Sequence, residues 1–224
     1  MNQLIDTWSS IPEEEDGMND EHFWIWTEMI RSLGMDLTRS KVLDFGCNQG
    51  GFLRLLFDMN PFAEGVGIDI ARDAVARAEA IKGDRPITYL ASANIGESGE
   101  AFDAVFSHEV IYLIEDLREH ATDVARVLKP GCSYFAVTCC LKENPNWSRW
   151  RGRIKSFSKL PVPDHGVCEI ADAFRMSGFD VSVSRFLADA FIPLPAPNDY
   201  FMNDLDTLEI YSRWKLMFKM TLPD

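Results

Sequence analysis

Residues 41–53 read Lys-Val-Leu-Asp-Phe-Gly-Cys-Asn-Gln-Gly-Gly-Phe-Leu, an apolar run followed by a turn of small residues. The apolar run, with the single acid Asp44, is typical of a strand that is buried on both faces of a parallel sheet. Gly46 and Gly50 can take positive φ and have no Cβ, so a ligand can lie against the backbone there. Asn48 is the non-glycine residue that best tolerates left-handed backbone angles. The stretch therefore predicts a strand, a ligand-binding turn and a helix.

The helix expected from Gly51 onward points its free N–H groups at the same turn. Such groups favour an anionic or carboxylate part of a nucleotide-like ligand. Glycine-rich turns between a strand and a helix also arise from close packing alone. The turn by itself leaves both interpretations open.

An acid follows at the spacing expected for a carboxylate that binds a sugar. Residues 65–69 read Gly-Val-Gly-Ile-Asp, a second apolar strand that ends about twenty residues after the turn. In a βαβ unit such an acid can accept hydrogen bonds from both ribose hydroxyls, and Ile70 is placed to cover an adenine ring. Alternatively, Asp69 caps the Ala-rich helix expected over residues 71–82.

Four motifs together point to one family. They are Asp44-x-Gly46-x-Asn48-x-Gly50, Gly67-x-Asp69, Phe102-Asp-Ala-Val105 and Leu128-Lys-Pro-Gly131. Their order and spacing over residues 38–140 resemble those of class I S-adenosylmethionine-dependent methyltransferases. One departure is Asn48, which stands where that family has its middle glycine.

The resemblance implies a single domain over residues 1–224, built on a seven-stranded, mostly parallel Rossmann-like sheet. The implied strand order is 3-2-1-4-5-7-6, with helices on both faces and a terminal antiparallel hairpin. We divide the chain into an N-terminal cap helix region (1–37), a cofactor-binding core (38–140), a basic and aromatic substrate segment (141–166) and a C-terminal helix and hairpin (167–224). The implied function is methyl transfer from S-adenosylmethionine to a small molecule, with an oxygen or nitrogen nucleophile favoured.

The resemblance also implies a cofactor site. The expected cofactor-binding residues are Asp44, Gly46, Cys47, Asn48, Gly50, Asp69, Ile70, Asn94, Ile95, Ser107 and His108. Asn94 follows the third expected strand, residues 86–91, where the family usually has an acid that meets the adenine amino group. The Asn94 amide can hydrogen-bond to adenine in its place, or it can form a plain Asx turn.

Two histidines are candidate general bases. His108 follows the fourth expected strand, residues 102–107, at the edge where open α/β sheets bind ligands. An imidazole there can remove a proton from a phenol, hydroxyl or amine, or it can simply line the cleft. His165 precedes the helix expected over residues 167–177, on a loop that faces the substrate in related enzymes. Many enzymes of this kind work mostly by positioning the nucleophile, so the need for a base stays open.

The segment after the core is basic and aromatic. Its candidate substrate-binding residues are Trp147, Trp150 and Arg151, because Arg and Trp together can hold an anionic or aromatic substrate. The alternatives are a solvated amphipathic helix and, less favoured, an RNA site. Trp24, on a helix expected over residues 19–33 that covers the cofactor cleft in the family, is a further candidate, with core packing as its alternative.

The two ends of the chain are expected to differ. Residues 1–19 predict an irregular, acidic lead-in. Residues 180–186 and 208–220 alternate apolar and polar side chains, which predicts the sixth strand and a final antiparallel strand. The aromatic connection over residues 190–206 either overhangs the cleft or forms a homodimer contact.

Composition limits the partners. The chain of 224 residues carries 35 acids against 22 bases, a net charge of −13, which disfavours nucleic acid. The sequence has no apolar run of the roughly 20 residues that span a bilayer, and its acidic start does not resemble a signal peptide. We therefore expect a cytoplasmic enzyme without membrane partners. The five cysteines include no CxxC pair, so we expect reduced thiols and no metal site.

Two other functions stay open at this stage. An NAD-dependent oxidoreductase also uses a glycine-rich turn followed by an acid, although Asn48 and the final hairpin disfavour it. A non-catalytic protein that keeps the fold to bind the cofactor is the third hypothesis.

Overall fold

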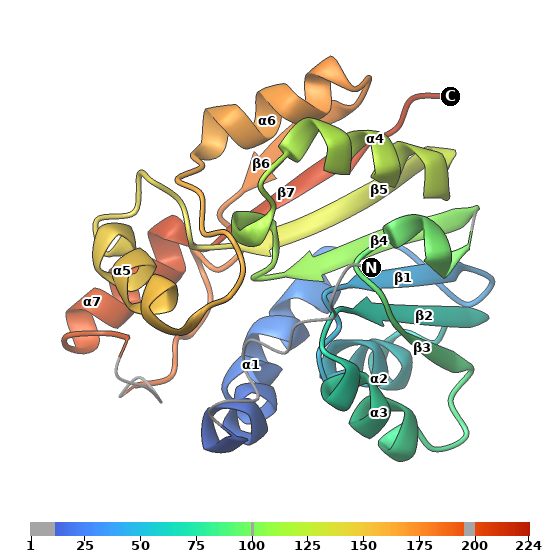
Figure 1. Ribbon diagram of the computed structural model, residues 1–224, viewed down its shortest axis with the longest axis horizontal. Coiled ribbons are helices and arrows are strands. Elements are labelled where there is room, and N and C mark those ends of the chain that lie inside the picture. Colours follow the sequence, from blue (N-terminus) through green and yellow to red (C-terminus); the bar gives the residue numbers. More distant parts are fainter. Residues whose placement is uncertain (1–11, 100, 195–199) are drawn as a thin grey trace.

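The computed structural model describes residues 12–99, 101–194 and 200–224, with side chains from residue 22 onward. Its centre is a seven-stranded sheet in the order β3-β2-β1-β4-β5-β7-β6 (Figure 1). The strands are β1 (Lys41–Phe45), β2 (Glu64–Asp69), β3 (Ile87–Ala91), β4 (Phe102–His108), β5 (Leu128–Thr138), β6 (Asp180–Ser184) and β7 (Leu216–Thr221). Only β7 runs antiparallel to its neighbours β5 and β6. The predicted strand order and terminal hairpin are confirmed.

Helices cover both faces of the sheet (Figure 1). The helices are α1 (Pro12–Ser32), α2 (Gly51–Met59), α3 (Arg72–Ile81), α4 (Leu117–Val127), α5 (Trp147–Phe157), α6 (Val167–Met176) and α7 (Asp204–Glu209). Helices α1, α2 and α3 bury side chains such as Met29, Leu53 and Ala78 in one core. Helices α4 and α6 bury Val124 and Phe174 in a second core. The buried side chains of α5, Trp147, Trp150 and Ile154, belong to a smaller apolar cluster beyond the end of β5.

Two expected boundaries are wrong, and local signals explain both. Residues 12–18 belong to α1, because Pro12 suits a first helical position and the acids of residues 13–16 suit a helix N-terminus. The remaining lead-in residues, 1–11, lie outside the described part of the chain.

The second wrong boundary is at the final strand. Its first half, residues 208–215, is mostly helical: α7 passes into a π-helical segment, Ile210–Trp214, before β7 begins. The Asn203 side chain accepts a hydrogen bond from the backbone N–H of Asp206 and so caps α7. The buried Ile210 and Tyr211 then face the core together, which an alternating strand would not allow.

The carboxyl ends of the parallel strands meet on the side of the sheet where α1 and α5 lie (Figure 1). The turn after β1 is tied to β2 at this edge, because Gly46 N–H and Cys47 N–H donate to the Ile68 carbonyl at 2.8 and 3.1 Å. The turn after β1, Asp69 at the end of β2 and His108 at the end of β4 therefore lie at one edge of the sheet.

Replacement of Gly46 by alanine should destabilise the fold more than the same change at Gly34. Both glycines have positive φ, 79° and 61°. A Cβ at Gly46 would lie 2.3 Å from a methyl carbon of Val110, whereas a Cβ at Gly34 would meet nothing within 4 Å. We expect Gly34→Ala to cost about 1–2 kcal/mol from backbone conformation alone. Gly46→Ala should cost about 1–3 kcal/mol more from overpacking, measured by urea unfolding. Equal losses would contradict the packing role of Val110.

Candidate active site

The turn after β1 adopts the left-handed conformations that the sequence predicts. Gly46, Asn48 and Gly50 have φ of 79°, 45° and 70°. The carboxylate of Asp69 holds this turn, accepting from the backbone N–H of Asn48 and of Ala71, each at 2.8 Å. Asp69 therefore joins the turn to the entry of α3. Each carboxylate oxygen has further acceptor capacity, which a ribose hydroxyl can use.

The two glycines are explained by internal packing. The methyl groups of Val110 occupy the position that a Cβ at Gly46 would take. The ring of Tyr89 occupies the position that a Cβ at Gly50 would take. The Tyr89 hydroxyl donates to the Gly50 carbonyl at 3.1 Å. Protein side chains thus fill these positions, where we expected a ligand to lie against the backbone.

The entrance of α2 offers polar groups to a ligand. Among the side chains that the structure describes, none caps its N-terminus, where Gly50 is the N-cap residue. The Nε2 atom of Gln49 beside it is buried and has no hydrogen-bond partner among the described residues. Because a buried donor without a partner is costly, it fits a site that a polar ligand completes. The free N–H groups of the helix suit the carboxylate of an amino acid moiety.

Asp44 is buried at the end of β1 with an exposed fraction of 3%. Burial, with the nearby charge of Asp69, raises the pKa of Asp44 to about 8. Its neighbour Cys47 is also buried, and burial raises the pKa of its thiol. Both groups are therefore mostly uncharged near pH 7 in the ligand-free protein, and a cationic ligand beside Asp44 would favour its ionised form.

A pair of histidines lies at the end of β4. The ring of His22, from α1, meets the ring of His108 edge-on with 4.6 Å between centroids. The Trp26 indole N–H donates to Nδ1 of His108 at 3.2 Å. Burial, together with the charge of Lys215, lowers the pKa of His22 to about 4 and that of His108 well below its ordinary value. Both imidazoles are therefore neutral near pH 7.

The hydrogen bond from Trp26 determines how His108 can act. A neutral imidazole whose Nδ1 accepts carries its proton on Nε2. That Nε2 is buried and has no partner among the described residues. His108 thus carries its N–H on a buried Nε2 in this structure, and its role as a general base stays a prediction.

A buried ion pair supports this edge. Lys215 Nζ lies 2.5 Å from Glu109 Oε1, and the two side chains are 3% and 16% exposed. Glu109 also accepts from the Thr138 hydroxyl at 2.7 Å and from the Cys139 backbone N–H at 3.0 Å. Burial opposes the charge, but Lys215 and these hydrogen bonds hold the pKa of Glu109 below its ordinary value. Sequence reasoning missed His22, Glu109 and Lys215 as site residues.

The same region contains a possible set of metal ligands. One ligand atom from each of Glu109, Cys139 and Cys140 lies within 4.8 Å of the others. The Lys215 ammonium already contacts Glu109 there and lies 4.0 Å from the Cys139 sulfur. A positive charge in this position disfavours a metal ion.

Several other expected cofactor residues make internal contacts. The Ser107 hydroxyl bonds to the Tyr134 hydroxyl at 2.6 Å. Asn94 Oδ1 accepts from Gly96 N–H at 2.9 Å, so the Asx turn is present, and the buried Ile95 belongs to the core. Ile70 is half-buried beside Asp69. The roles of Asn94, Ile95 and Ile70 toward adenine stay predictions.

The remaining candidates make contacts with other parts of the protein. His165 Nε2 donates to the Ile114 carbonyl at 2.7 Å, and Trp24 packs edge-on against Tyr211. Trp147 and Trp150 are buried, and their indole N–H groups donate to Asp164 and to the Tyr200 carbonyl. Arg151 Nε donates to the Val162 carbonyl at 2.8 Å. The centre of the basic segment over residues 141–166 is thus helix α5, whose tryptophans pack inward.

Residues 43–134 match a family model described as a methyltransferase domain. The O-methyltransferase resE of Aspergillus sclerotiorum is 25% identical over 177 residues, which cover 75% of this chain and 66% of that protein. The mitochondrial ubiquinone biosynthesis O-methyltransferase of Homo sapiens is 32% identical over 113 residues, which cover 47% of this chain and 30% of that protein. The chain thus spans less than two thirds of these curated relatives.

Solved structures share the fold. A complex of the Haloferax volcanii Trm112 methyltransferase activator with a methyltransferase matches with a TM-score of 0.82 and 24% identity, covering 97% of this chain and 96% of that chain. A phosphoethanolamine N-methyltransferase of Haemonchus contortus, in complex with phosphomonomethylethanolamine and S-adenosylhomocysteine, has a TM-score of 0.66 and 17% identity, covering 100% of this chain and 61% of that chain.

The strand order, the glycine turn and the acid after β2 define a Rossmann-like nucleotide-binding fold of the methyltransferase type. Residues 43–134, which carry this turn and this acid, match the methyltransferase-domain model, and the whole chain has the fold of the methyltransferases named above. The Haemonchus contortus enzyme is in complex with S-adenosylhomocysteine, the demethylated product of S-adenosylmethionine, which is the cofactor that the sequence predicts for this chain. Within the described ranges, the helices are all too short or too polar to cross a membrane.

Asp44 should make the stability of the ligand-free protein fall as the pH rises from 7 to 8. Its pKa is about 8 in the folded chain and 3.8 ordinarily, so the folded chain holds a proton that the unfolded chain releases. Stability is therefore lost as the pH rises through this window, by up to about 1.4 kcal/mol per pH unit. The unfolded histidines, whose ordinary pKa is 6.5, still hold part of a proton at pH 7 and oppose this slope equally in the wild type and in Asp44→Asn. Urea unfolding at several pH values should therefore show that the wild type loses stability relative to Asp44→Asn as the pH rises. A stability difference between the two proteins that does not change with pH would refute the prediction.

Proposed function

We propose that this protein transfers the methyl group of S-adenosylmethionine to a small-molecule acceptor, with an oxygen nucleophile favoured. The observation that carries the proposal is the meeting of two sets of groups at one sheet edge. The Asp69-bound turn and the open N-terminus of α2 form one set. The neutral pair His22 and His108 forms the other. The curated relatives named above, all O-methyltransferases, support the choice of oxygen.

The turn and its neighbours fit the cofactor chemically. Asp69 would bind the ribose hydroxyls, the N-terminus of α2 with Gln49 would bind the carboxylate, and Asp44 would face the cationic part. When bound, the cofactor supplies an activated methyl group on a sulfonium. The protein then needs to orient the acceptor oxygen toward that group and to remove its proton.

The two histidines divide this task in the proposal. His108 donates its Nε2–H to the acceptor and so orients it, because its Nδ1 is held by Trp26. His22 lies beside it and is neutral down to about pH 4, so we assign proton removal to His22. His165 is less suited, since its Nε2 is bonded to the Ile114 carbonyl. An aromatic or anionic acceptor, the cytoplasmic location and a homodimer contact stay predictions from the sequence.

Calorimetric titration of S-adenosylmethionine and S-adenosylhomocysteine into the purified protein tests the cofactor. We expect saturable binding of both that Asp69→Asn weakens by about 1–3 kcal/mol, because a charged hydrogen-bond acceptor is lost. The control is Asp73→Asn, a similar change at an exposed position in the first turn of α3. If the wild type binds neither compound, the proposal is wrong. Binding of NAD by a protein that does not bind S-adenosylmethionine would favour the oxidoreductase hypothesis.

Methyl transfer from labelled cofactor to a panel of phenols, hydroxy acids and amines tests the reaction. We expect His22→Gln to lower kcat by about 10²- to 10⁴-fold without loss of cofactor affinity, as for a general base. Because the pKa of His22 is about 4, wild-type activity should persist as the pH falls from 7 to 5. An acid limb near pH 6.5 would argue against His22. Cofactor binding without transfer to any acceptor would favour the non-catalytic alternative.

A further inference from the structure

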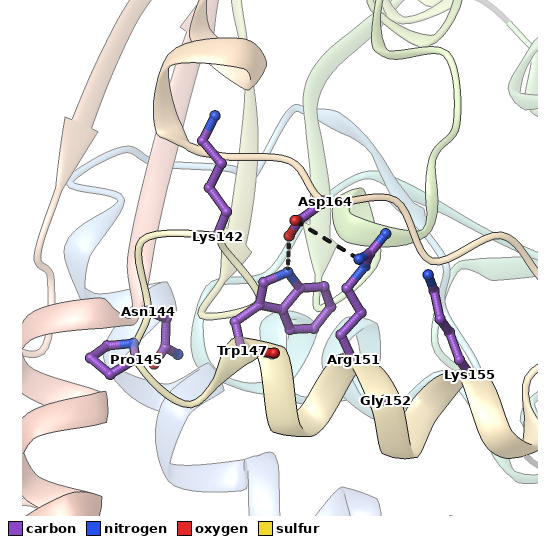
Figure 2. Close-up of a pocket in the computed structure, with 9 residues that line it drawn as sticks. Lys142, Asn144, Pro145, Trp147, Arg151, Gly152, Lys155 and Asp164 are labelled. Atoms are coloured by element: carbon purple, nitrogen blue, oxygen red, sulfur yellow. Dashed lines mark hydrogen bonds and ion pairs between the residues drawn. The ribbon is translucent and has the colours of Figure 1, made fainter.

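A pocket of about 330 Å³ lies beside α5, apart from the residues assigned above to methyl transfer. Its wall includes Lys142, Trp147, Arg151, Gly152, Lys155 and Asp164 (Figure 2). None of the residues of the glycine turn, the Asp69 region or the histidine pair lines it. The Trp147 indole lines the pocket and also packs edge-on against Tyr112, in the turn that follows β4.

The pocket is positively charged in an acidic protein. Three cations, Lys142, Arg151 and Lys155, line it against one acid, Asp164. Their side chains project to the same side of α5, and the Asp164 carboxylate lies above the helix (Figure 2). The chain as a whole has a net charge of −13, so this local excess of positive charge is unusual for its surface. A concave site with this balance attracts an anion.

The cations are only partly neutralised. The Asp164 carboxylate accepts from Trp147 Nε1 at 2.9 Å and lies 3.8 Å from Arg151 Nη1, which is long for a charged hydrogen bond. Lys142 pairs with Glu169, outside the pocket. Lys155 makes no ion pair with any residue that the structure describes. Arg151 and Lys155 therefore retain hydrogen-bonding capacity toward a ligand.

Gly152 gives a second, independent indication. It lies in the middle of α5, where glycine is less favourable than alanine. A Cβ at this position would meet no protein atom within 4 Å, so packing does not explain the glycine. The residue leaves bare backbone at the pocket wall, next to Arg151 and about one turn before Lys155, where a ligand can approach closely.

We propose that this pocket binds a small anionic ligand with phosphate or carboxylate groups, held by Arg151, Lys155 and Lys142 and lying against Gly152. The anion belongs either to the distal part of the methyl acceptor or to a separate effector. Both kinds of ligand would present the same anionic groups to the pocket. Measurements of KM and kcat in the presence of pyrophosphate distinguish the two.

Inorganic pyrophosphate is the probe, titrated calorimetrically into the full chain at constant ionic strength. We expect one saturable site in the wild type. Lys155→Glu should weaken binding at least tenfold, because it reverses the charge at the unpaired cation. The matched control is Lys159→Glu, the same change at an exposed residue outside the pocket wall, which should alter affinity less than twofold.

Two further variants test the geometry without threatening the fold. Gly152→Ala should raise the melting temperature and yet weaken pyrophosphate binding, since its methyl group occupies the pocket wall. Asp164→Asn keeps an acceptor for Trp147 and removes the opposing charge, so it should tighten binding severalfold. Absence of saturable binding in the wild type, or equal losses in Lys155→Glu and Lys159→Glu, would overturn the proposal.

The source of the anion is decided with any acceptor that the methyl-transfer screen finds. Pyrophosphate that raises KM for the acceptor alone assigns the pocket to the acceptor, and pyrophosphate that changes kcat assigns it to an effector. The calorimetric result does not depend on turnover, so a failure of the proposed function leaves this test intact.

Discussion

The carboxylate of Asp69 makes the contact that holds together the sheet edge at which we propose that the cofactor binds. By accepting from the backbone N–H of Asn48 and of Ala71, it holds the turn after β1 against the start of α3. The turn is already fixed to β2 through the Ile68 carbonyl. These contacts hold the end of β1, the end of β2, and the starts of α2 and α3 together at one point. A ligand that binds there meets groups that are already in place, which lowers the entropy cost of ordering them.

Local patterns predicted the βαβ core because the residues that decide it are neighbours in the sequence. The strand over residues 41–45, the left-handed Asn48 and the acid at the end of β2 all follow from short-range spacing. The helix over residues 208–214 was missed because alternation in a short window favours a strand equally well.

The histidine pair and the buried ion pair are different. Trp26 and His108 are 82 residues apart, and Glu109 and Lys215 are 106 apart. No local pattern connects such residues; only the folded sheet edge brings them together. His108 itself was singled out by its position after β4, but the tautomer of its ring follows from a tryptophan on α1, which sequence spacing does not connect to it.

The π-helical segment before β7 has a consequence for the evolution of the chain. Lys215 N–H donates to the Ile210 carbonyl five residues earlier, so one extra residue is accommodated in the last helical turn. That extra residue sets the rotation at which the Lys215 ammonium enters the interior. Loss of a single codon from this stretch would turn the ammonium by about 100°, the angle per residue of a helix. A change in the length of this turn would therefore take the Lys215 ammonium away from Glu109 and leave that buried carboxylate with its hydrogen bonds from Thr138 and Cys139 but without a counter-charge.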